Sequence, residues 1–494
     1  MTHKNNRPNI LFLCTDQQRF DSLGCYGAPG VRTPNLDRLA AQGARFDTCY
    51  VQNPICGPSR ASLFTGMYAR NHGLWANGVS LPPQRKMFTR ALADGGYDCG
   101  MIGKQHLSAC EGWQTEPRKD DGYRVFEWAH DGIHRSPQNA YLGWLRTNFP
   151  ETYIDLFPTP GSVEEANAGN KARRATPINT VPVEAHYSHW VAERAIAFIE
   201  TPRETPFFLV ANFFDPHHPF GVPEAYRALI DADEIAPPIG GVSELDSKPS
   251  AQMNLSRKSY GGAAPGYQDY SAEEIREIRA TYHAMIALVD DEVGRILDSL
   301  ERSGQVDNTL VVFTSDHGEM LGDHAMMLKG PMLYDAVTRV PLILRWPDRI
   351  APGTEIPEIV QWIDLSATFL DVAGLPPMAS QQGASLLPLA TEGRDPGWRD
   401  WAICEYRDSC IPEQTPMMTT MLRKGDWKLI VWHGDISADR SPEGELYNLS
   451  SDPNELNNLF HEPDYLPVRR RMKAELVAAI SETSDRGAPR TSNW

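Results

Sequence analysis

A short run around Cys56 combines residue types that can hold and attack an anion. Residues 56–60 read Cys-Gly-Pro-Ser-Arg, and Thr-Gly follows at 65–66. Pro58 suits the first turn of a helix, because its missing N–H would have no helical partner there, and Gly57 leaves the preceding loop unhindered. The free backbone donors and the dipole of a helix N-terminus favour an anion, and Arg60 adds a cation within one turn. We therefore expect residue 56 at a helix N-terminus that faces a tetrahedral oxyanion ester.

Polar side chains able to bind a metal or an anion follow four apolar runs of strand length. The runs are residues 9–15, 97–103, 207–214 and 310–315, and the groups at their ends are Asp16 with Gln17, Lys104 with His106, Asp215 with His217 and His218, and Asp316 with His317. In open α/β sheets, ligands bind outside the carboxyl ends of the strands. Each group alone could be a helix cap, a loop histidine or a solvated charge. Four of them together with Cys56 favour one shared site.

Two of these strand ends carry donors that suit a hard metal ion. Asp16 and Gln17 follow one strand, and Asp316 and His317 follow another. Carboxylate, amide and imidazole donors fit Ca²⁺, Mn²⁺ or Mg²⁺ and differ from the thiolate-rich sets of structural zinc. We expect one divalent metal ion here, with Ca²⁺ as the favoured ion.

The run that begins at Cys56 resembles the signature of the sulfatase family, which reads Cys or Ser, any residue, Pro, Ser or Ala, Arg, and Thr-Gly a few residues on. Residues 314–319, Thr-Ser-Asp-His-Gly-Glu, resemble the second metal motif of that family, and Asp16 with Gln17 resembles its N-terminal acidic pair. Gln17 replaces the commoner second Asp, which is similar to choline sulfatases and to bacterial phosphonate monoester hydrolases of the family. C-terminal runs within 424–455 also match, so the resemblance spans nearly the whole chain.

The resemblance implies a modified nucleophile. In the family, the residue at position 56 is oxidised by a formylglycine-generating enzyme to formylglycine, an aldehyde whose hydrate attacks the ester and also binds the metal. Cys56 would then not act as a thiol. A small buried cysteine is the ordinary alternative for an isolated Cys.

The resemblance also implies roles for the other matched positions. By resemblance, Lys104 and Lys329 contact the anionic oxygens of the ester with help from Arg60, His217 lies near the leaving group, and His106 handles a formylglycine hydroxyl. Asn77 is similar to a substrate-binding Asn of the phosphonate monoester hydrolases, and a turn-forming Asn before Gly is an equal alternative. Among the unassigned histidines, we expect His324 to be the one that lines the pocket.

Three other functions stay open beside hydrolysis of aryl or alkyl sulfates. A phosphonate monoester hydrolase or phosphodiesterase of the same family would share the matched residues. A two-metal phosphatase would need a second cluster of His and Asp ligands, which the sequence does not reveal. An inactive binding homologue would lack a metal ligand or the nucleophile, and none is missing.

Composition limits the partners of the chain. A hydrophobic fraction of 41% and a charged fraction of 22% are those of a soluble globular protein. The net charge of −17 argues against nucleic acid and anionic membranes, since both repel an acidic surface. The eight cysteines show no metal-ligand pair spacing, and we find no signal peptide or transmembrane run. These features predict a cytoplasmic enzyme with mostly free thiols that acts on a small molecule, and a homo-oligomer is compatible with them.

The order of elements predicts an α/β fold. Apolar strands that alternate with helices favour a large, mostly parallel sheet sandwiched by helices, in a catalytic domain of residues 1–395. A capping box at Ser271–Glu274 starts a helix that continues to about residue 300. Residues 225–270 lack periodicity and are expected to be a long surface excursion. A C-terminal subdomain of residues 396–494 should contain a small antiparallel sheet and a helix from about 466 to 481.

Overall fold

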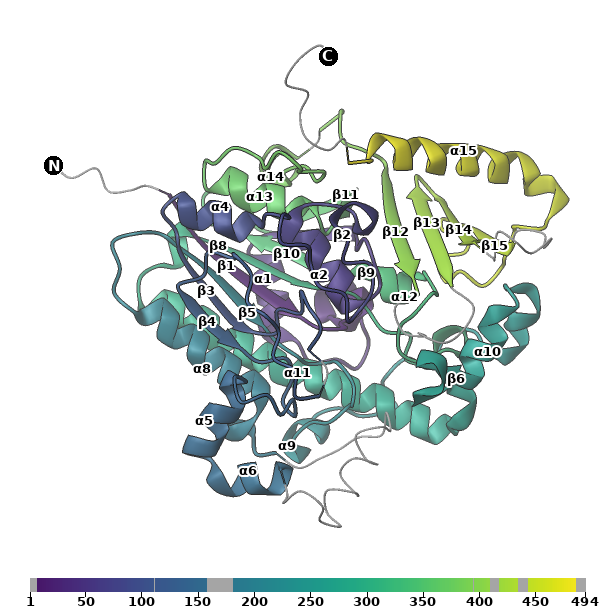
Figure 1. Ribbon diagram of the computed structural model, residues 1–494. Helices are drawn as coiled ribbons and strands as arrows, with labels where there is room; N and C mark the ends of the chain where they lie inside the picture. Colours follow the sequence, from purple (N-terminus) through teal and green to yellow (C-terminus); the bar gives the residue numbers. More distant parts are fainter. Residues whose placement is uncertain are drawn as a thin grey trace.

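A nine-stranded sheet forms the centre of the computed structural model, which describes residues 7–110, 112–157, 181–393, 395–408, 417–433 and 443–485 (Figure 1). Its strand order is β11-β2-β10-β8-β1-β5-β3-β4, and β9 pairs with β2. The strands are β1 (Asn9–Thr15), β2 (Ala44–Tyr50), β3 (Asp98–Gly103), β4 (Val125–Trp128), β5 (Phe207–Asn212), β8 (Thr309–Ser315), β9 (Arg339–Val340), β10 (Leu342–Arg345) and β11 (Thr354–Gln361). Strands β8, β1, β5, β3 and β4 are parallel, whereas β10 is antiparallel to both its neighbours.

Helices cover both faces of this sheet. Successive residues of β1 face opposite sides, so Leu11 packs in one core and Phe12 in the other. The Leu11 side is covered by α8 (Tyr187–Glu200) and α11 (Ala272–Arg302), and the Phe12 side by α2 (Cys56–Thr65), α4 (Phe88–Asp94) and α13 (Asp364–Val372). The predicted α/β sandwich is therefore confirmed. The capping box of α11 is also present, because Ser271 and Glu274 bond to each other's backbone N–H.

Shorter elements connect these layers. Among the described residues, the shorter helices are α1 (Pro34–Ala41), α3 (Ala69–His72), α5 (Ala140–Asn148), α6 (Pro150–Leu156), α9 (Glu224–Arg227), α10 (Ala251–Arg257), α12 (Asp335–Thr338) and α14 (Leu387–Glu392). A two-stranded ribbon of β6 (Lys258–Ser259) and β7 (Ala264–Pro265) lies apart from the large sheet.

The C-terminal region forms the small antiparallel sheet that the sequence predicts. Its strands are β12 (Trp401–Arg407), β13 (Met418–Lys424), β14 (Trp427–His433) and β15 (Glu443–Asn448), and α15 (Leu466–Glu482) packs on it through Met472 and Leu476. Buried Lys428 of β14 joins this sheet to the large domain, since its Nζ lies 2.9 Å from Asp335 Oδ1 of α12 and 2.7 Å from Glu455 Oε1. A domain division at residue 395 stays a prediction.

The segment 225–270 is more ordered than the sequence predicts. It contains α10 and the β6–β7 ribbon, and it buries Leu245 and Leu255. Lys248 Nζ donates to the Tyr447 hydroxyl at 2.6 Å and to the Glu455 carbonyl at 2.7 Å, so the segment packs on the C-terminal sheet. These contacts join residues about 200 positions apart, which local periodicity cannot reveal.

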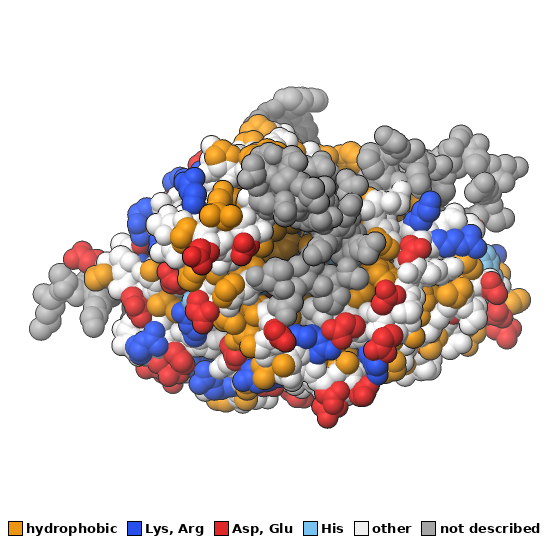
Figure 2. Space-filling view, turned by 90° about the horizontal axis from the view of Figure 1, so that it is seen from below, with side chains coloured by type: hydrophobic (Ala, Val, Ile, Leu, Met, Phe, Trp, Pro, Cys, Tyr) orange, Lys and Arg blue, Asp and Glu red, His pale blue; other side chains and the backbone are white. Residues whose placement is uncertain are grey.

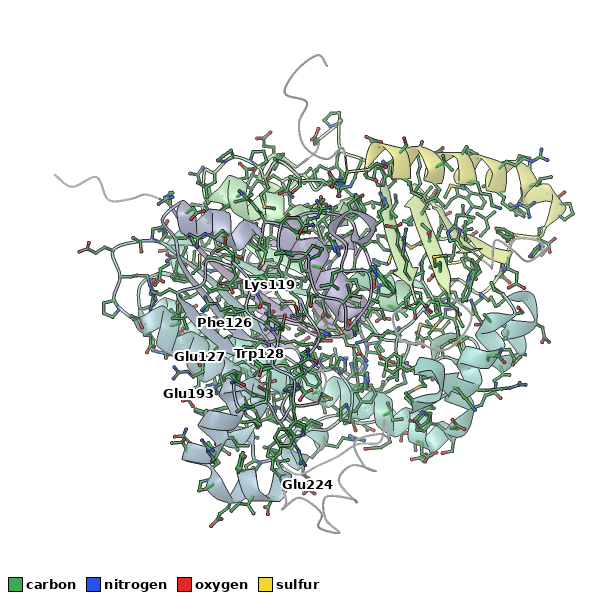
Figure 3. The ribbon with its side chains drawn as sticks, viewed as in Figure 1. Lys119, Phe126, Glu127, Trp128, Glu193 and Glu224 are labelled. Atoms are coloured by element: carbon green, nitrogen blue, oxygen red, sulfur yellow. The ribbon has the colours of Figure 1, made fainter. Side chains whose placement is uncertain are left out.

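The surface mixes charges of both signs. On the face in Figure 2, Asp and Glu side chains are interspersed with Lys and Arg, and hydrophobic side chains border a hollow. On the edge strand β4, labelled at Phe126, Glu127 and Trp128 in Figure 3, the Glu127 carboxylate forms an ion pair with Arg194 of α8 at 2.7 Å.

Within the described part of the chain, no helix is both long and apolar enough to traverse a bilayer. The seven cysteines in that part are unbridged, and Cys410 lies outside it.

Candidate active site

Cys56 is the first residue of α2 and is 1% exposed, as the sequence predicts for a helix N-terminus. The backbone N–H of Gly57 donates to Asn77 Oδ1 at 3.0 Å, so this amide side chain is fixed at the start of the helix. A Cβ atom at Gly57 would come within 2.8 Å of the same oxygen, so a larger residue there would displace the Asn77 side chain. Ser59 Oγ donates to the Asp316 carbonyl at 2.6 Å and ties α2 to the end of β8.

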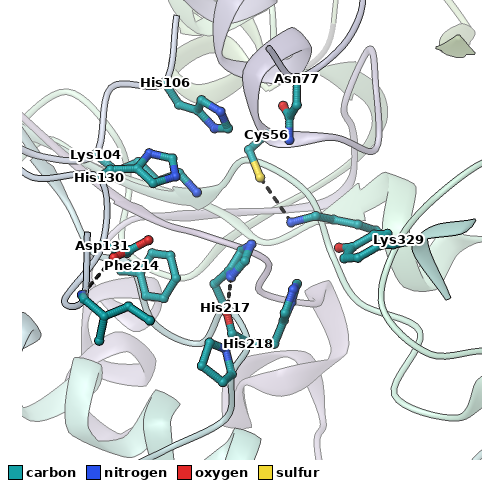
Figure 4. Close-up of a pocket in the computed structure, with 13 residues that line it drawn as sticks. Cys56, Asn77, Lys104, His106, His130, Asp131, Phe214, His217, His218 and Lys329 are labelled. Carbon is teal, nitrogen blue, oxygen red and sulfur yellow. Dashed lines mark hydrogen bonds between the residues drawn. The ribbon is translucent and has the colours of Figure 1, made fainter. Parts of the chain in front are cut away.

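A cavity of about 440 Å³ opens over Cys56 at the carboxyl ends of the central strands (Figure 4). Figure 4 shows Lys329 on one side of Cys56 and His106 and His130 on the other. The lining residues are Cys56, Asn77, Lys104, His106, His130, Asp131, Ile133, Phe214, His217, His218, Pro219, Tyr260 and Lys329.

Four buried side chains beneath this cavity form a group that could hold a metal ion. Asp16, Cys56, Asp316 and His317 each offer one ligand atom, and these atoms lie within 4.8 Å of one another. Asp16 Oδ1 is 3.7 Å from both Cys56 Sγ and His317 Nε2, and Asp316 Oδ1 is 3.6 Å from His317 Nε2. Two carboxylates and an imidazole fit a hard or borderline divalent cation. The expected ligands Asp16, Asp316 and His317 are therefore brought together.

Gln17, the departure from an acidic pair, lies beside this group. Its backbone N–H donates to Asp316 Oδ1 at 3.1 Å, and its Oε1 accepts from Lys329 Nζ at 2.6 Å. Its amide nitrogen donates to the Glu319 carboxylate, which also accepts from the Leu321 N–H at 3.1 Å. Glu319 therefore turns the amide so that the oxygen faces Lys329. Glu319 ends the matched motif, but its role was not predicted from the sequence.

Arg60 does not take the position that was expected for it. Its Nε donates to Asp316 Oδ2 at 2.7 Å and its Nη2 lies 3.3 Å from Asp16 Oδ2, while Nη1 donates to the Lys104 carbonyl at 2.9 Å. The guanidinium is 1% exposed and is not among the groups that line the cavity. It therefore holds the two carboxylates in place instead of meeting the ester oxygens, because a buried carboxylate pair needs a cationic partner.

Two lysines flank Cys56. Lys329 Nζ is 3.1 Å from Cys56 Sγ, and Lys104 Nζ is 2.6 Å from Asp16 Oδ2. Burial alone would raise the pKa of the Cys56 thiol, but Lys104, Lys329 and His317 together hold that pKa well below its usual value. The same field would stabilise any negative group that develops at position 56.

His217 and His218 stack on each other at a centroid distance of 4.1 Å. His217 Nε2 is 4.0 Å from Asp16 Oδ1, whereas His218 Nδ1 is 3.1 Å from Gln17 Nε2. Burial and the charge of Lys329 lower the pKa of His217 to about 4, so its ring is neutral at pH 7. His217 is the nearer of the two to the Asp16 carboxylate, and its place near the leaving group stays a prediction.

Two expected pocket residues lie elsewhere. The Asp215 carboxylate accepts from Ser188 Oγ and lies 3.7 Å from His186 Nδ1, so it turns away from Cys56 although it follows β5. His324 Nδ1 bonds to Glu244 Oε1 at 2.7 Å, its ring stacks on Tyr334, and it is not a lining residue. The expectation for His324 was therefore wrong, because nearness in sequence to a metal motif does not fix the direction of a side chain.

Several residues that line the cavity were not predicted from the sequence. His130 and Asp131 follow β4, and Phe214 and Tyr260 come from the long connections after β5. Strand β4 has only four residues, so its signal was weak. A search for polar pairs after every short apolar run would have found His130 and Asp131.

Comparisons with known proteins agree over most of the chain. The model of the family described as Sulfatase matches residues 8–375, and one described as N-sulphoglucosamine sulphohydrolase, C-terminal, matches residues 322–482. The chain is 29% identical over 509 residues to an N-acetylglucosamine-6-O-sulfatase of Bacteroides thetaiotaomicron, with 97% of this chain and 87% of the relative covered. It is 30% identical over 492 residues to a multifunctional alkaline phosphatase superfamily protein of Trinickia caryophylli, covering 94% and 93%. The crystal structure of a phosphonate monoester hydrolase of Agrobacterium radiobacter superposes with a TM-score of 0.81 at 26% identity, covering 97% of each chain.

Replacing Asp316 tests the metal group. Asp316→Ala removes a ligand oxygen, so we expect divalent-ion affinity to fall by more than about tenfold. Elemental analysis after gel filtration and titration calorimetry would measure this. His324→Ala is the matched control, since it changes a buried residue outside the group, and it should keep the metal. Stoichiometric metal with unchanged affinity in Asp316→Ala would contradict the assignment.

Proposed function

Because the chain belongs to the sulfatase family, we propose that it hydrolyses aryl or alkyl sulfate monoesters with a formylglycine made from Cys56 and one divalent metal ion. The observation that carries this proposal is the position of Cys56, buried at the start of α2 between two lysines and next to a carboxylate and imidazole group. A formylglycine-generating enzyme would be the maturation partner, and the substrate would be a small sulfate ester.

Asp16, Gln17, Asp316, His317 and residue 56 would hold the metal ion. We favour Ca²⁺, with Mn²⁺ or Mg²⁺ as alternatives, because the donors other than residue 56 are oxygen and imidazole. When bound, the ion would act as a Lewis acid that offsets negative charge on the reacting ester. Hydrated formylglycine would offer two hydroxyls on one carbon, one to attack and one whose proton leaves as the anion is released.

The side chains around residue 56 would bind the ester and transfer protons. Lys104 and Lys329 lie on the cavity wall and would bind the peripheral oxygens of the ester. His106 lines the cavity together with residue 56, so it would take the proton from a hydroxyl there. His217 would protonate the departing alcohol. A bound anion would raise the pKa of the His217 ring, since negative charge favours the imidazolium, and this would offset the lowering by burial and Lys329.

A second candidate is hydrolysis of phosphonate monoesters or phosphodiesters. The TM-score of 0.81 to a phosphonate monoester hydrolase favours it, together with Gln17 beside the metal group and Asn77 on the cavity wall. Sulfate monoesters, phosphonate monoesters and phosphodiesters are all singly charged at neutral pH, whereas phosphate monoesters approach a double charge because their second pKa is about 6. The net charge of the substrate therefore distinguishes phosphate monoesters from the other three classes of ester.

The nucleophile can be tested by peptide mass spectrometry. In protein produced together with a formylglycine-generating enzyme, the peptide that contains residue 56 should carry an aldehyde that reacts with hydrazides. Cys56→Ala should lose both this label and turnover, while Cys99→Ala, which changes another buried thiol, should keep both. A fully active preparation with only an unmodified thiol at residue 56 would show that the proposed nucleophile is wrong.

Substrate preference can be tested with a panel of 4-nitrophenyl esters compared by kcat/KM. We expect the singly charged esters to be cleaved, aryl sulfate foremost, and the phosphate monoester to be at least about tenfold slower, because the cavity and leaving-group protonation suit a monoanion. A phosphonate ester in first place would select the second candidate. A phosphate monoester in first place would refute both and favour a two-metal phosphatase.

A further inference from the structure

A second group of metal-ligand side chains lies at the edge of the same cavity. His106, Cys110 and His130 each offer one ligand atom within 4.8 Å of the others. Cys110 Sγ is 3.2 Å from His130 Nδ1, and the His106 and His130 rings meet edge to face at 4.7 Å. His106 and His130 lie next to each other on the cavity wall across from Lys329 (Figure 4). The proposed function uses neither Cys110 nor His130.

The backbone around this group is held by Glu116, which is 3% exposed. Its Oε2 accepts from the His106 N–H and from Trp128 Nε1, both at 2.9 Å, and its Oε1 accepts from the Leu107 N–H. One carboxylate therefore joins the loop after β3 to the end of β4. His134 adds a second link, since its Nε2 lies 2.6 Å from the Cys110 carbonyl. These hydrogen bonds thus hold in place the backbone that carries the three ligand side chains.

One polar atom of the group has no partner. His106 is 7% exposed, and its Nδ1 makes no hydrogen bond with any described residue. A buried imidazole nitrogen without a partner costs free energy unless a ligand or water meets it. A metal ion between the two rings and the thiol would satisfy this nitrogen.

We propose that His106, Cys110 and His130 form a second metal site, which takes a borderline-soft divalent cation such as Zn²⁺. One thiolate and two imidazoles are ligands that Zn²⁺ prefers in proteins, and they contrast with the two carboxylates of the Asp16 group. Three protein ligands would leave a fourth tetrahedral position for water or another ligand. Binding converts the Cys110 thiol to a metal thiolate and releases its proton to solvent.

His106 and Cys56 line the same cavity, so the two groups are neighbours. A metal-bound His106 ring cannot also accept a proton. Occupation of the second site would therefore block the base role proposed for His106. The existence of the site itself does not depend on the proposed function.

Cobalt spectroscopy tests the site without reference to activity. In Cys56→Ala protein, which lacks the other thiol near a metal group, one equivalent of Co²⁺ should give a thiolate-to-cobalt charge-transfer band that Zn²⁺ then abolishes. Adding Cys110→Ala should remove the band. Adding Cys99→Ala, which changes a buried thiol of β3 outside the group, should keep it.

A second variant distinguishes the loss of a metal ligand from misfolding caused by the Cys110 substitution. Adding His130→Asn should weaken Co²⁺ binding at least about tenfold while the far-ultraviolet circular dichroism stays that of the parent. Absence of the band in Cys56→Ala protein, or its persistence after Cys110→Ala, would overturn the proposal. Unchanged Co²⁺ affinity in a folded His130→Asn variant would also overturn it.

Discussion

The burial of two carboxylates is the constraint on which the site depends. Asp16 and Asp316 are both fully buried at the ends of adjacent parallel strands. An unpaired charge in that position costs several kcal/mol, so the chain surrounds the pair with Arg60, Lys104 and Lys329. Arg60 and Lys104 form ion pairs with these carboxylates, and Lys329 Nζ lies 4.0 Å from Asp16 Oδ1. Arg60 is therefore explained by the carboxylates, whereas the two lysines also line the cavity.

The electrostatic field of the site differs in sign from the net charge of the whole chain. The chain carries a net charge of −17, yet the cavity over residue 56 lies in a positive field that lowers the pKa of the Cys56 thiol and suits a bound anion. The field is built by the fold, because parallel strands β8, β1, β5 and β3 end at one edge of the sheet. An anionic ester would thus be attracted over short distances by the cavity and not by the net charge of the chain.

The sequence predicted the parts of the site that are local in the chain. The ends of β1, β3 and β8 and the start of α2 were placed correctly, since apolar runs and a helix-starting proline are short-range signals. Side-chain direction was not predictable in the same way. Arg60 and Asp215 turn towards partners on other elements, His324 packs on Tyr334, and Cys110 in the loop after β3 meets His130 in the loop after β4. These contacts join different elements of the fold, and only the assembled structure determines them.

The central claim is that a single hard metal ion lies against residue 56, held by the ends of β1 and β8. Anomalous diffraction from crystals of the matured protein grown with Mn²⁺ would test this most directly. The account predicts one strong peak, within bonding distance of Asp16, Asp316, His317 and an aldehyde-derived oxygen at residue 56. Two peaks a few Å apart over the same carboxylates, or no peak beside residue 56, would contradict it.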